Sequence, residues 1–393
     1  MSFQNDMDID NATGAVVRGD INNALKSLAT NCKGDSAPST NYASQFFANT
    51  TSSIMQINNT AGNSFINLFT LTGGPAFAVD GTINSVNIGK GANSVAANTV
   101  LGELALDAAV SGGFNTAIGK QSLTTNTSGS NNTGIGYLTL YLNSSGADNT
   151  AVGSGALNQN ATSNHNTAVG HDALGVNTGA QNTAVGSLAL DHNQGADNNT
   201  AVGYLALTTN TTGTFNCAVG QAAGESVSTG HSNTALGRAA LNQNQSAANN
   251  TAVGSSALLM ATAANNTVVG AFAADALSTG SEVTAVGVNA LTNMTGESFS
   301  VAVGSSAGLY ATGERNTFVG RAAGIGNSGG ANGAGNTAVG NEALASYSGG
   351  SHNSAFGKFA GGNITSGIEN LCLGYGAGIT GSPSGNITDS CIY

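Results

Sequence analysis

The sequence is poor in the residues that build large globular cores. It has no tryptophan, only three prolines and 5% aromatic residues, although 40% of its 393 residues are hydrophobic. Disordered chains combine low hydrophobicity with high charge, whereas charged residues make up only 7% of this sequence. The composition therefore excludes both disorder and one compact core, and it predicts thin, stacked layers of small side chains.

Positive charge is also scarce. Nine basic residues are set against 20 acidic ones, giving a net charge of −11, and the basic residues form no stripe. Nucleic-acid binding is not predicted, because it needs a clustered basic surface. No run approaches the roughly 20 apolar residues of a membrane span, so no membrane insertion is predicted. The opening MSFQNDMDID lacks the apolar segment of a secretory signal, and we expect synthesis in a cytoplasm.

Cysteine is too sparse and too scattered to form a framework. The four cysteines contain no CxxC pair. This spacing favours small buried thiols in a reducing compartment over a disulfide frame or a zinc site. The four residues are Cys32, Cys217, Cys372 and Cys391.

What the sequence does contain is one short motif in many copies. HNTAVGHDAL begins at His165, QNTAVGSLAL at Gln181 and NNTAVGYLAL at Asn198. With the glycine of this motif as a marker, most steps are about 17 residues long, and a fixed period of this kind indicates a repeat architecture. Three steps are shorter by one, the first is shorter by four, and the step to Gly340 is longer by three. The markers are Gly89, Gly102, Gly119, Gly136, Gly153, Gly170, Gly186, Gly203, Gly220, Gly237, Gly254, Gly270, Gly287, Gly304, Gly320, Gly340, Gly357 and Gly374.

Each position of the repeat has a predicted role. Glycine, asparagine and threonine recur too often for helices, so short strands joined by turns are expected. The Val, Ile or Leu before the marker and the Leu four residues after it are predicted to form a narrow aliphatic core. The alanine three residues after the marker predicts close approach of another backbone, from the same coil or from a neighbouring subunit. The asparagine four residues before the marker predicts an amide ladder, or else reflects tolerance of turn geometry.

The predicted fold is all-β: a parallel β-solenoid, or β-roll, of about 18 coils with a 17-residue period, intertwined or packed as a homotrimer, with a small α+β module at the N-terminus. Seventeen steps at an inter-strand spacing of about 4.8 Å give a rod of roughly 80 Å. Each coil buries only a few small side chains and could not stand alone. Association with copies of the same chain is therefore expected.

Two domains are predicted from the distribution of the repeat. Residues 1–80 carry none, and they are predicted to form an attachment module with a short helix at 20–30 and a hairpin or small sheet at 42–72. Residues 81–393 are predicted to form the solenoid shaft. The pattern stops where a further coil would begin, so we expect the natural protein to continue past Tyr393.

The sequence predicts no catalytic, cofactor-binding or metal-binding residues. Asp172 and Asp191 come nearest to the paired carboxyl groups, about 5–10 Å apart, of a glycan-cleaving enzyme. Acidic residues nevertheless number fewer than one per coil and fall in variable positions, which favours a solvated face. GIGNSGGANGAG lacks the GK[ST] of a phosphate loop. The histidines have no HxxxH or HExxH spacing for a metal; they are His165, His171, His192, His231 and His352.

The motif NTAVGxxAL with its NxxG connectors resembles the repeat arrays of phage tail fibres. It is also similar to the left-handed parallel β-roll of trimeric autotransporter adhesin heads. The N-terminal DINNALKSLA, followed by DSAPSTNYASQFFANTTSSIMQI, resembles the virion-attachment module of tail fibres from marine phages, cyanophages included. This module favours the phage resemblance, because autotransporters need a signal peptide and a C-terminal membrane anchor.

The resemblance implies a non-enzymatic structural and adhesion protein of the virion, made in the host cytoplasm. It implies a homotrimer that docks to adaptor or nozzle proteins of the phage tail through residues 1–80. A distal region would meet a host surface receptor, either a glycan or an outer-membrane protein. No functional residue is carried over, because the matching motifs are structural.

Three other functions stay open. A bacterial surface adhesin head would share the repeat. A tailspike glycan depolymerase would need an acid pair in one groove. An ice-binding solenoid would need an exposed threonine face; threonine recurs three residues before the marker, but its alternation with alanine also allows it to point inward.

Overall fold

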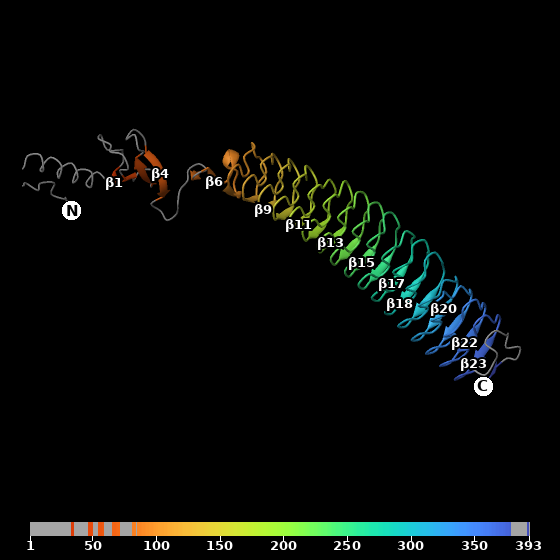
Figure 1. Cartoon of the computed structure of the whole chain (residues 1–393). Helices are drawn as coiled ribbons and strands as arrows, with labels where there is room; N and C mark the ends of the chain where they lie inside the picture. Colours follow the sequence, from red (N-terminus) through yellow and green to blue (C-terminus); the bar gives the residue numbers. More distant parts are fainter. Residues whose placement is uncertain are drawn as a thin grey trace, which may run out of the picture. The chain divides into compact units, whose positions relative to one another are not determined.

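The chain divides into two compact units, Met1–Gly81 and Thr82–Tyr393 (Figure 1). The predicted helix at 20–30 lies outside the described residues. The computed structural model describes residues 85–378 in full, together with the backbone of strand residues 33–34, 46–49, 54–58, 65–70, 81–83 and 391–392.

The described part of the first unit is a four-stranded sheet in the order β1-β2-β3-β4. β3 pairs antiparallel with β2 on one side and with β4 on the other, and β1 pairs parallel with β2. The pairing of β3 with β4 shifts register between Met55 and Gln56. The strands are β1 Lys33–Gly34, β2 Phe46–Asn49, β3 Ile54–Asn58 and β4 Phe65–Thr70.

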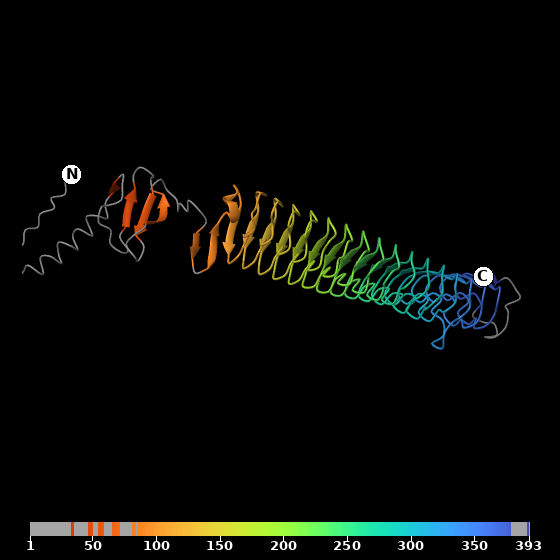
Figure 2. The same cartoon turned by 90° about the horizontal axis from the view of Figure 1, so that it is seen from above.

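The second unit begins with a hairpin and continues as a solenoid. After β5 (Gly81–Ile83), β6 (Val86–Gly89) pairs antiparallel with β7 (Thr99–Gly102), and the 3-10 turn η1 (Ala92–Ser94) lies between them (Figure 2). The first predicted marker, Gly89, therefore closes a hairpin strand and not a coil, which accounts for the short first step. From β7 onward each strand pairs parallel with the next, as far as β24 (Cys391–Ile392).

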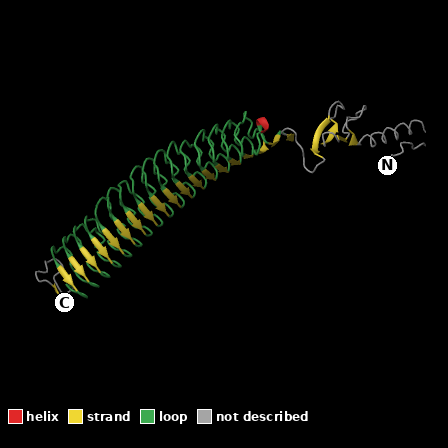
Figure 3. Ribbon diagram, turned by 180° about the vertical axis from the view of Figure 1, so that it is seen from behind, coloured by secondary structure: helices red, strands yellow, loops and turns green. Residues whose placement is uncertain are grey.

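The coils are regular, with one short strand each, and they confirm the predicted all-β parallel solenoid. Equivalent ladder residues of successive coils are about 17 residues apart, as the predicted period requires. Figure 3 shows the strands along one side of this unit and the loops along the other. No α-helix occurs among residues 85–378. The strands are β8 Thr116–Ile118, β9 Thr133–Ile135, β10 Thr150–Val152, β11 Thr167–Val169, β12 Thr183–Val185, β13 Thr200–Val202, β14 Cys217–Val219, β15 Thr234–Leu236, β16 Thr251–Val253, β17 Thr267–Val269, β18 Thr284–Val286, β19 Val301–Val303, β20 Thr317–Val319, β21 Thr337–Val339, β22 Ser354–Phe356 and β23 Leu371–Leu373.

Strand register is kept even where coil length changes. Thr167 pairs with Thr150 across a coil of the usual length and with Thr183 across a coil that is one residue shorter. Thr317 pairs with Thr337 across the longest coil. The additional residues of that coil lie in the loop between β20 and β21, so length variation is absorbed away from the sheet.

The core prediction was partly wrong. In each strand the middle residue points inward and its two neighbours point outward, as in β10, where Ala151 is fully buried between half-buried Thr150 and Val152. The residue before the marker therefore faces outward and does not belong to the core. The interior is filled by that middle alanine together with the alanine and leucine of the turn, Ala156 and Leu157 in the same coil.

The physical reason lies in the turn after each strand. Leu157 has φ 51°, in the left-handed region that costs a non-glycine residue about 1–2 kcal/mol. Full burial of a leucine side chain stabilises by about 1.5–3 kcal/mol, which offsets this strain. The leucine thus occupies most of the narrow coil, and only alanine fits on the strand opposite it.

Phe318 shows that coil volume is conserved. It replaces the inward alanine of β20, and the leucine position of its own coil and of the coil before it is glycine, Gly324 and Gly308. A Cβ added at Gly308 would lie 2.9 Å from the Phe318 ring. The ring fills the space that two leucines occupy elsewhere.

The marker glycines are required by their backbone. Gly254 has φ +137°, and a Cβ there would lie 2.5 Å from the carbonyl oxygen of Gly270 in the next coil. The same close approach recurs from coil to coil, for example between Gly186 and Gly203. Adjacent coils therefore meet backbone to backbone at this corner.

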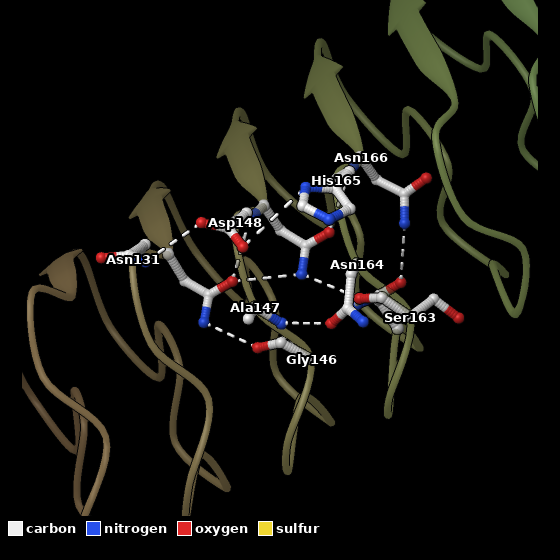
Figure 4. A network of polar contacts seen from close by, with 11 residues as sticks. Asn131, Gly146, Ala147, Asp148, Ser163, Asn164, His165 and Asn166 are labelled. Carbon is white, nitrogen blue, oxygen red and sulfur yellow. Dashed lines mark hydrogen bonds and ion pairs between the residues drawn. The ribbon is translucent and has the colours of Figure 1, made fainter.

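Asparagine amides connect the coils, as the ladder prediction required. The Asn149 Oδ1 accepts the backbone N–H of Asn166 at 3.0 Å, and its Nδ2 donates to the Asn132 Oδ1 at 3.1 Å. The same Nδ2 donates across its own coil to the carbonyl oxygen of Ser163 at 2.9 Å. Each amide thus joins two coils and also braces the strand against the far loop (Figure 4).

A second buried asparagine ladder, which sequence reasoning missed, stands seven residues after the marker. Asn143 donates to the Asn126 Oδ1 at 3.0 Å, and Asn210 donates likewise to Asn193 at 3.0 Å. This ladder ends at Asn210, whose Oδ1 is buried without a partner, because the next coil places Val227 at the same position. Beyond it the position holds asparagine only at Asn244 and Asn327 and is otherwise mostly apolar: Ala261, Leu277, Met294, Ala311, Tyr347 and Ile364.

Candidate interaction surface

The outward residues of the strands form one continuous surface, here called the outer face: the first and third residues of β8–β23. The in-register pairing stacks these residues in two columns, one mostly threonine and one mostly valine. The threonines thus point outward, which removes the objection that alternation with alanine could turn them inward. The sequence signal for this was the alternation itself, since alanine and threonine on one short strand must face opposite sides.

The valine column is exposed although it is apolar. Val185 is 37% exposed and Val219 39%, while other members of the column, such as Val152, are half-buried. Neither column contains a charged residue in any coil from β8 to β23. The uncharged outer face with its apolar column is therefore a candidate interaction surface.

The charges gather along the two edges of the outer face. The position directly after the marker glycine, here the basic edge, holds Lys120, Arg238, Arg321 and Lys358. Only one basic residue of the coils from β8 onward, Arg315, lies elsewhere.

Three acidic residues also lie on the basic edge, at the first or second position after the marker. They are Glu103, which pairs with Lys120 at 3.1 Å, Asp172, and Glu342, which pairs with Arg321. Four basic residues thus stand against three acidic ones along this edge.

The opposite edge, five or six residues before the marker, is here called the acidic edge. It carries five acidic residues and one basic residue, Arg315, which pairs with Glu314 at 2.6 Å. The two edges therefore differ in the sign of their net charge. The acidic residues are Asp148, Asp197, Glu282, Glu314 and Glu369.

Exposed aromatic side chains stand on the same two edges. Tyr137 is 50% exposed and Tyr204 49% on the basic edge, while Phe114 is 70% and Phe215 62% exposed on the acidic edge. A surface with an apolar centre, aromatic residues and a charged periphery has the anatomy of a protein interface.

The acidic edge also carries a polar network (Figure 4). Asn131 donates to the Asp148 carboxylate at 3.1 Å, and the Nδ1 atom of His165 lies 3.8 Å from the same carboxylate. The three side chains come from equivalent positions of successive coils and are exposed. Asn131 and Asp148 are hydrogen-bonded, and His165 continues this polar row along the edge.

The strongest candidate for chemistry is the group around Asp191. The carboxylates of Asp172 and Asp191 lie 3.2 and 3.3 Å from the Nδ1 atoms of His171 and His192. Burial raises the pKa of Asp191; His192 opposes the shift and the negative charge of Asp172 adds to it. The two carboxylates therefore interact electrostatically. They do not occupy equivalent positions, because Asp191 stacks over Gly175 of the preceding coil and not over Asp172.

Other groups of ligating residues are absent from the described part. No cluster of three or more His, Cys, Asp or Glu side chains suited to a metal ion occurs among the described residues. Of the predicted buried thiols, Cys372 is buried in the core, whereas Cys217 is half-buried on the outer face. Cys32 lies outside the described residues, and so does the side chain of Cys391.

Comparisons with known proteins complete this description. No family model matches the chain, and no significant match was found among the curated proteins. No helix among the described residues is long and apolar enough to cross a membrane.

Proposed function

We propose that this chain is the shaft of a trimeric phage tail fibre, a structural and adhesion protein of the virion without catalytic activity. Residues 1–80 would attach it to an adaptor or nozzle protein of the tail. A distal region would be presented to a host surface receptor, either a glycan or an outer-membrane protein. The proposal rests on the sequence resemblance together with the solenoid fold.

The observation that carries this proposal is the uncharged outer face. It runs along every coil from β8 to β23, and its exposed valines favour contact with another apolar surface. The repeated residues of each coil serve packing and ladder hydrogen bonds, so the repeat supplies length in place of an active site. A long rod with a self-associating face is what a fibre shaft requires.

The mass of the purified chain in solution tests the proposal. Three copies of the 38.4 kDa chain give a particle of about 115 kDa, and sedimentation velocity should find this mass with the friction of an elongated body. A stable monomer at micromolar concentration would contradict the trimeric shaft. Attachment to the virion is tested separately, by labelling purified phage particles with antibodies against residues 1–80.

The outward threonines support a second candidate, an ice-binding solenoid. Threonine hydroxyls and valine methyl groups repeat about every 4.8 Å along the rod, in a regular array that could order water. Thermal hysteresis of the purified chain tests this function, with Thr200→Lys as the disrupting variant. The two candidates exclude each other over most of the face, because copies packed on it would cover the array.

The adhesin and depolymerase alternatives have their own tests. An adhesin head would be found on the surface of a bacterium that expresses the intact gene. A depolymerase would clear a polysaccharide lawn, and Asp191→Asn would abolish the clearing, since Asp191 with its raised pKa is the best candidate for the general acid. We favour the shaft because residues 1–80 resemble a phage attachment module, and because Asp191 stacks over Gly175 and not over Asp172.

A further inference from the structure

We propose that the outer face binds a second copy of this chain that runs parallel and in register, with the basic edge of one copy beside the acidic edge of the next. This inference rests on the proposed self-association and adds its face, direction and alignment. The partner that covers the outer face is thus another copy of the same chain. An antiparallel copy or a different protein are the alternatives that the experiments below distinguish.

The outer face is large enough to hold a partner. Three residues at about 3.3 Å each make it about 10 Å wide, and sixteen strands at about 4.8 Å make it about 75 Å long, which gives roughly 750 Å². A standard interface buries about 800 Å² on each partner. The edges add further area, so the face reaches the size of a stable interface without any other contact.

The face is also matched to itself in chemistry. Its centre holds mostly threonine and valine, with no charge to desolvate from β8 to β23. Its side chains are short, so burying them costs little side-chain entropy. A partner that is uncharged and equally regular fits this surface, and another copy is such a partner.

The charges on the edges determine the relative direction of the copies. When parallel copies are related by rotation about an axis along the rod, the basic edge of each copy lies beside the acidic edge of its neighbour. When copies run antiparallel, like edges meet. Five acidic residues on one edge would then face five on the other, which is repulsive. The edge charges therefore favour a parallel, cyclic arrangement.

Rotation about such an axis also sets the register. Equivalent coils stand at the same height, and because unlike edges meet, the threonine column of one copy lies beside the valine column of the next in the same coil. A cysteine at Thr150 of one copy would therefore meet a cysteine at Val152 of the next. In an antiparallel pair, by contrast, a residue near one end meets a residue near the other.

Disulfide cross-linking of single-cysteine variants tests the arrangement. The full chain with its four native cysteines replaced by serine carries Thr150→Cys, Val152→Cys or Thr337→Cys. All three positions are half-buried on the outer face, and Thr337 is far from the other two along the rod. After mild oxidation, a co-refolded mixture of the Thr150→Cys and Val152→Cys variants should form a covalent dimer, whereas neither variant alone should do so efficiently. The control is Thr162→Cys, an exposed loop position away from the face, and it should stay monomeric on a non-reducing gel.

Each outcome has a defined meaning. Dimers that form only in the mixture of Thr150→Cys and Thr337→Cys would establish antiparallel copies and overturn the inference. A trimeric mass without cross-linking in the mixture of Thr150→Cys and Val152→Cys would overturn it while leaving the trimeric shaft intact. A monomeric mass would overturn both. Efficient cross-linking through the Thr162→Cys control alone would place the interface on the loops and overturn the proposed face.

Charge reversal tests the edges independently. Glu282→Lys on the acidic edge should raise the apparent dissociation constant of the copies about two- to fivefold, since exposed ion pairs contribute modestly. Asp107→Lys makes the same charge change at an exposed position away from both edges and should leave it unchanged. Equal effects of the two reversals would show that net charge, and not edge complementarity, controls association.

Discussion

Replacing Asn149 by alanine should destabilise the solenoid by about 2–3 kcal/mol, mainly because a buried hydrogen-bond donor loses its partner. The asparagine side chain makes three hydrogen bonds and is fully buried. Of its partners, the carbonyl of Ser163 keeps a bond from Asn160, and the Asn132 Oδ1 keeps the backbone N–H of residue 149. Only the backbone N–H of Asn166 loses its sole acceptor.

The size of the effect follows from that one orphaned group. A buried donor left without a partner costs about 1–3 kcal/mol, and the bonds lost elsewhere add to it. A matched control is Asn164→Ala, because its Oδ1 accepts the N–H of Ala147 at 2.7 Å but the side chain is exposed. Water replaces that bond, so we expect a loss of less than about 1 kcal/mol.

Urea unfolding, followed by far-ultraviolet circular dichroism, gives the free energy of unfolding of each variant. Both variants are measured at one protein concentration, because the stability of an associating chain depends on that concentration. Hydrogen–deuterium exchange locates the effect, and the Asn166 amide should exchange faster in Asn149→Ala only. Equal destabilisation by the two substitutions would refute the view that the ladder acts through buried donors. A loss for Asn149→Ala below about 0.5 kcal/mol, the lower end for a single hydrogen bond, would refute it as well.

Four further predictions concern the distal coils. Val227→Asn should cost less than about 1 kcal/mol despite losing a buried valine, because the new amide pairs with the orphaned Oδ1 of Asn210, and urea unfolding measures it. Tyr347→Phe should stabilise the fold by about 1 kcal/mol in thermal unfolding, because the buried hydroxyl has no hydrogen-bond partner. Phe318→Ala should destabilise the fold by about 3–5 kcal/mol in the same assay, because it removes a fully buried ring. Burial raises the pKa of Asp275 above its ordinary value of 3.8, so the folded protein binds this proton more tightly than the unfolded chain. The free energy of unfolding should therefore fall as the pH rises from 3.8 through the raised pKa. Asp275→Asn should remove this fall in a pH series of urea midpoints, and a fall of unchanged size would contradict the assignment.

Period, strand position and the first amide ladder were predictable because each depends on residues that recur at one spacing. The TAV strand and its regular step determine the pairing of Thr150 with Thr167, whatever the loops contain. The second ladder was visible in the same way, as Asn126, Asn143 and Asn160, but the position loses its asparagine in most later coils and was overlooked. A column that changes character along the rod gives a weaker periodic signal.

The direction of the strand side chains was less predictable. Large aliphatic residues usually point inward, and this expectation placed Val152 in the core. The coil is so narrow that Leu157 occupies its centre, and its left-handed backbone is not apparent from sequence. The valine then has to face outward, against hydropathy. The outer face is therefore the feature that hydropathy alone would misplace.

The separation of loop length from strand register has a consequence for how such a chain can evolve. Since the sheet keeps its pairing across coils of different length, unequal recombination between any two repeats yields another complete set of coils. Each duplication would lengthen the rod by one strand spacing, about 4.8 Å, and extend the outer face by the same unit. Rod length would thus be inherited in discrete steps, with no need for compensating substitutions at the junction.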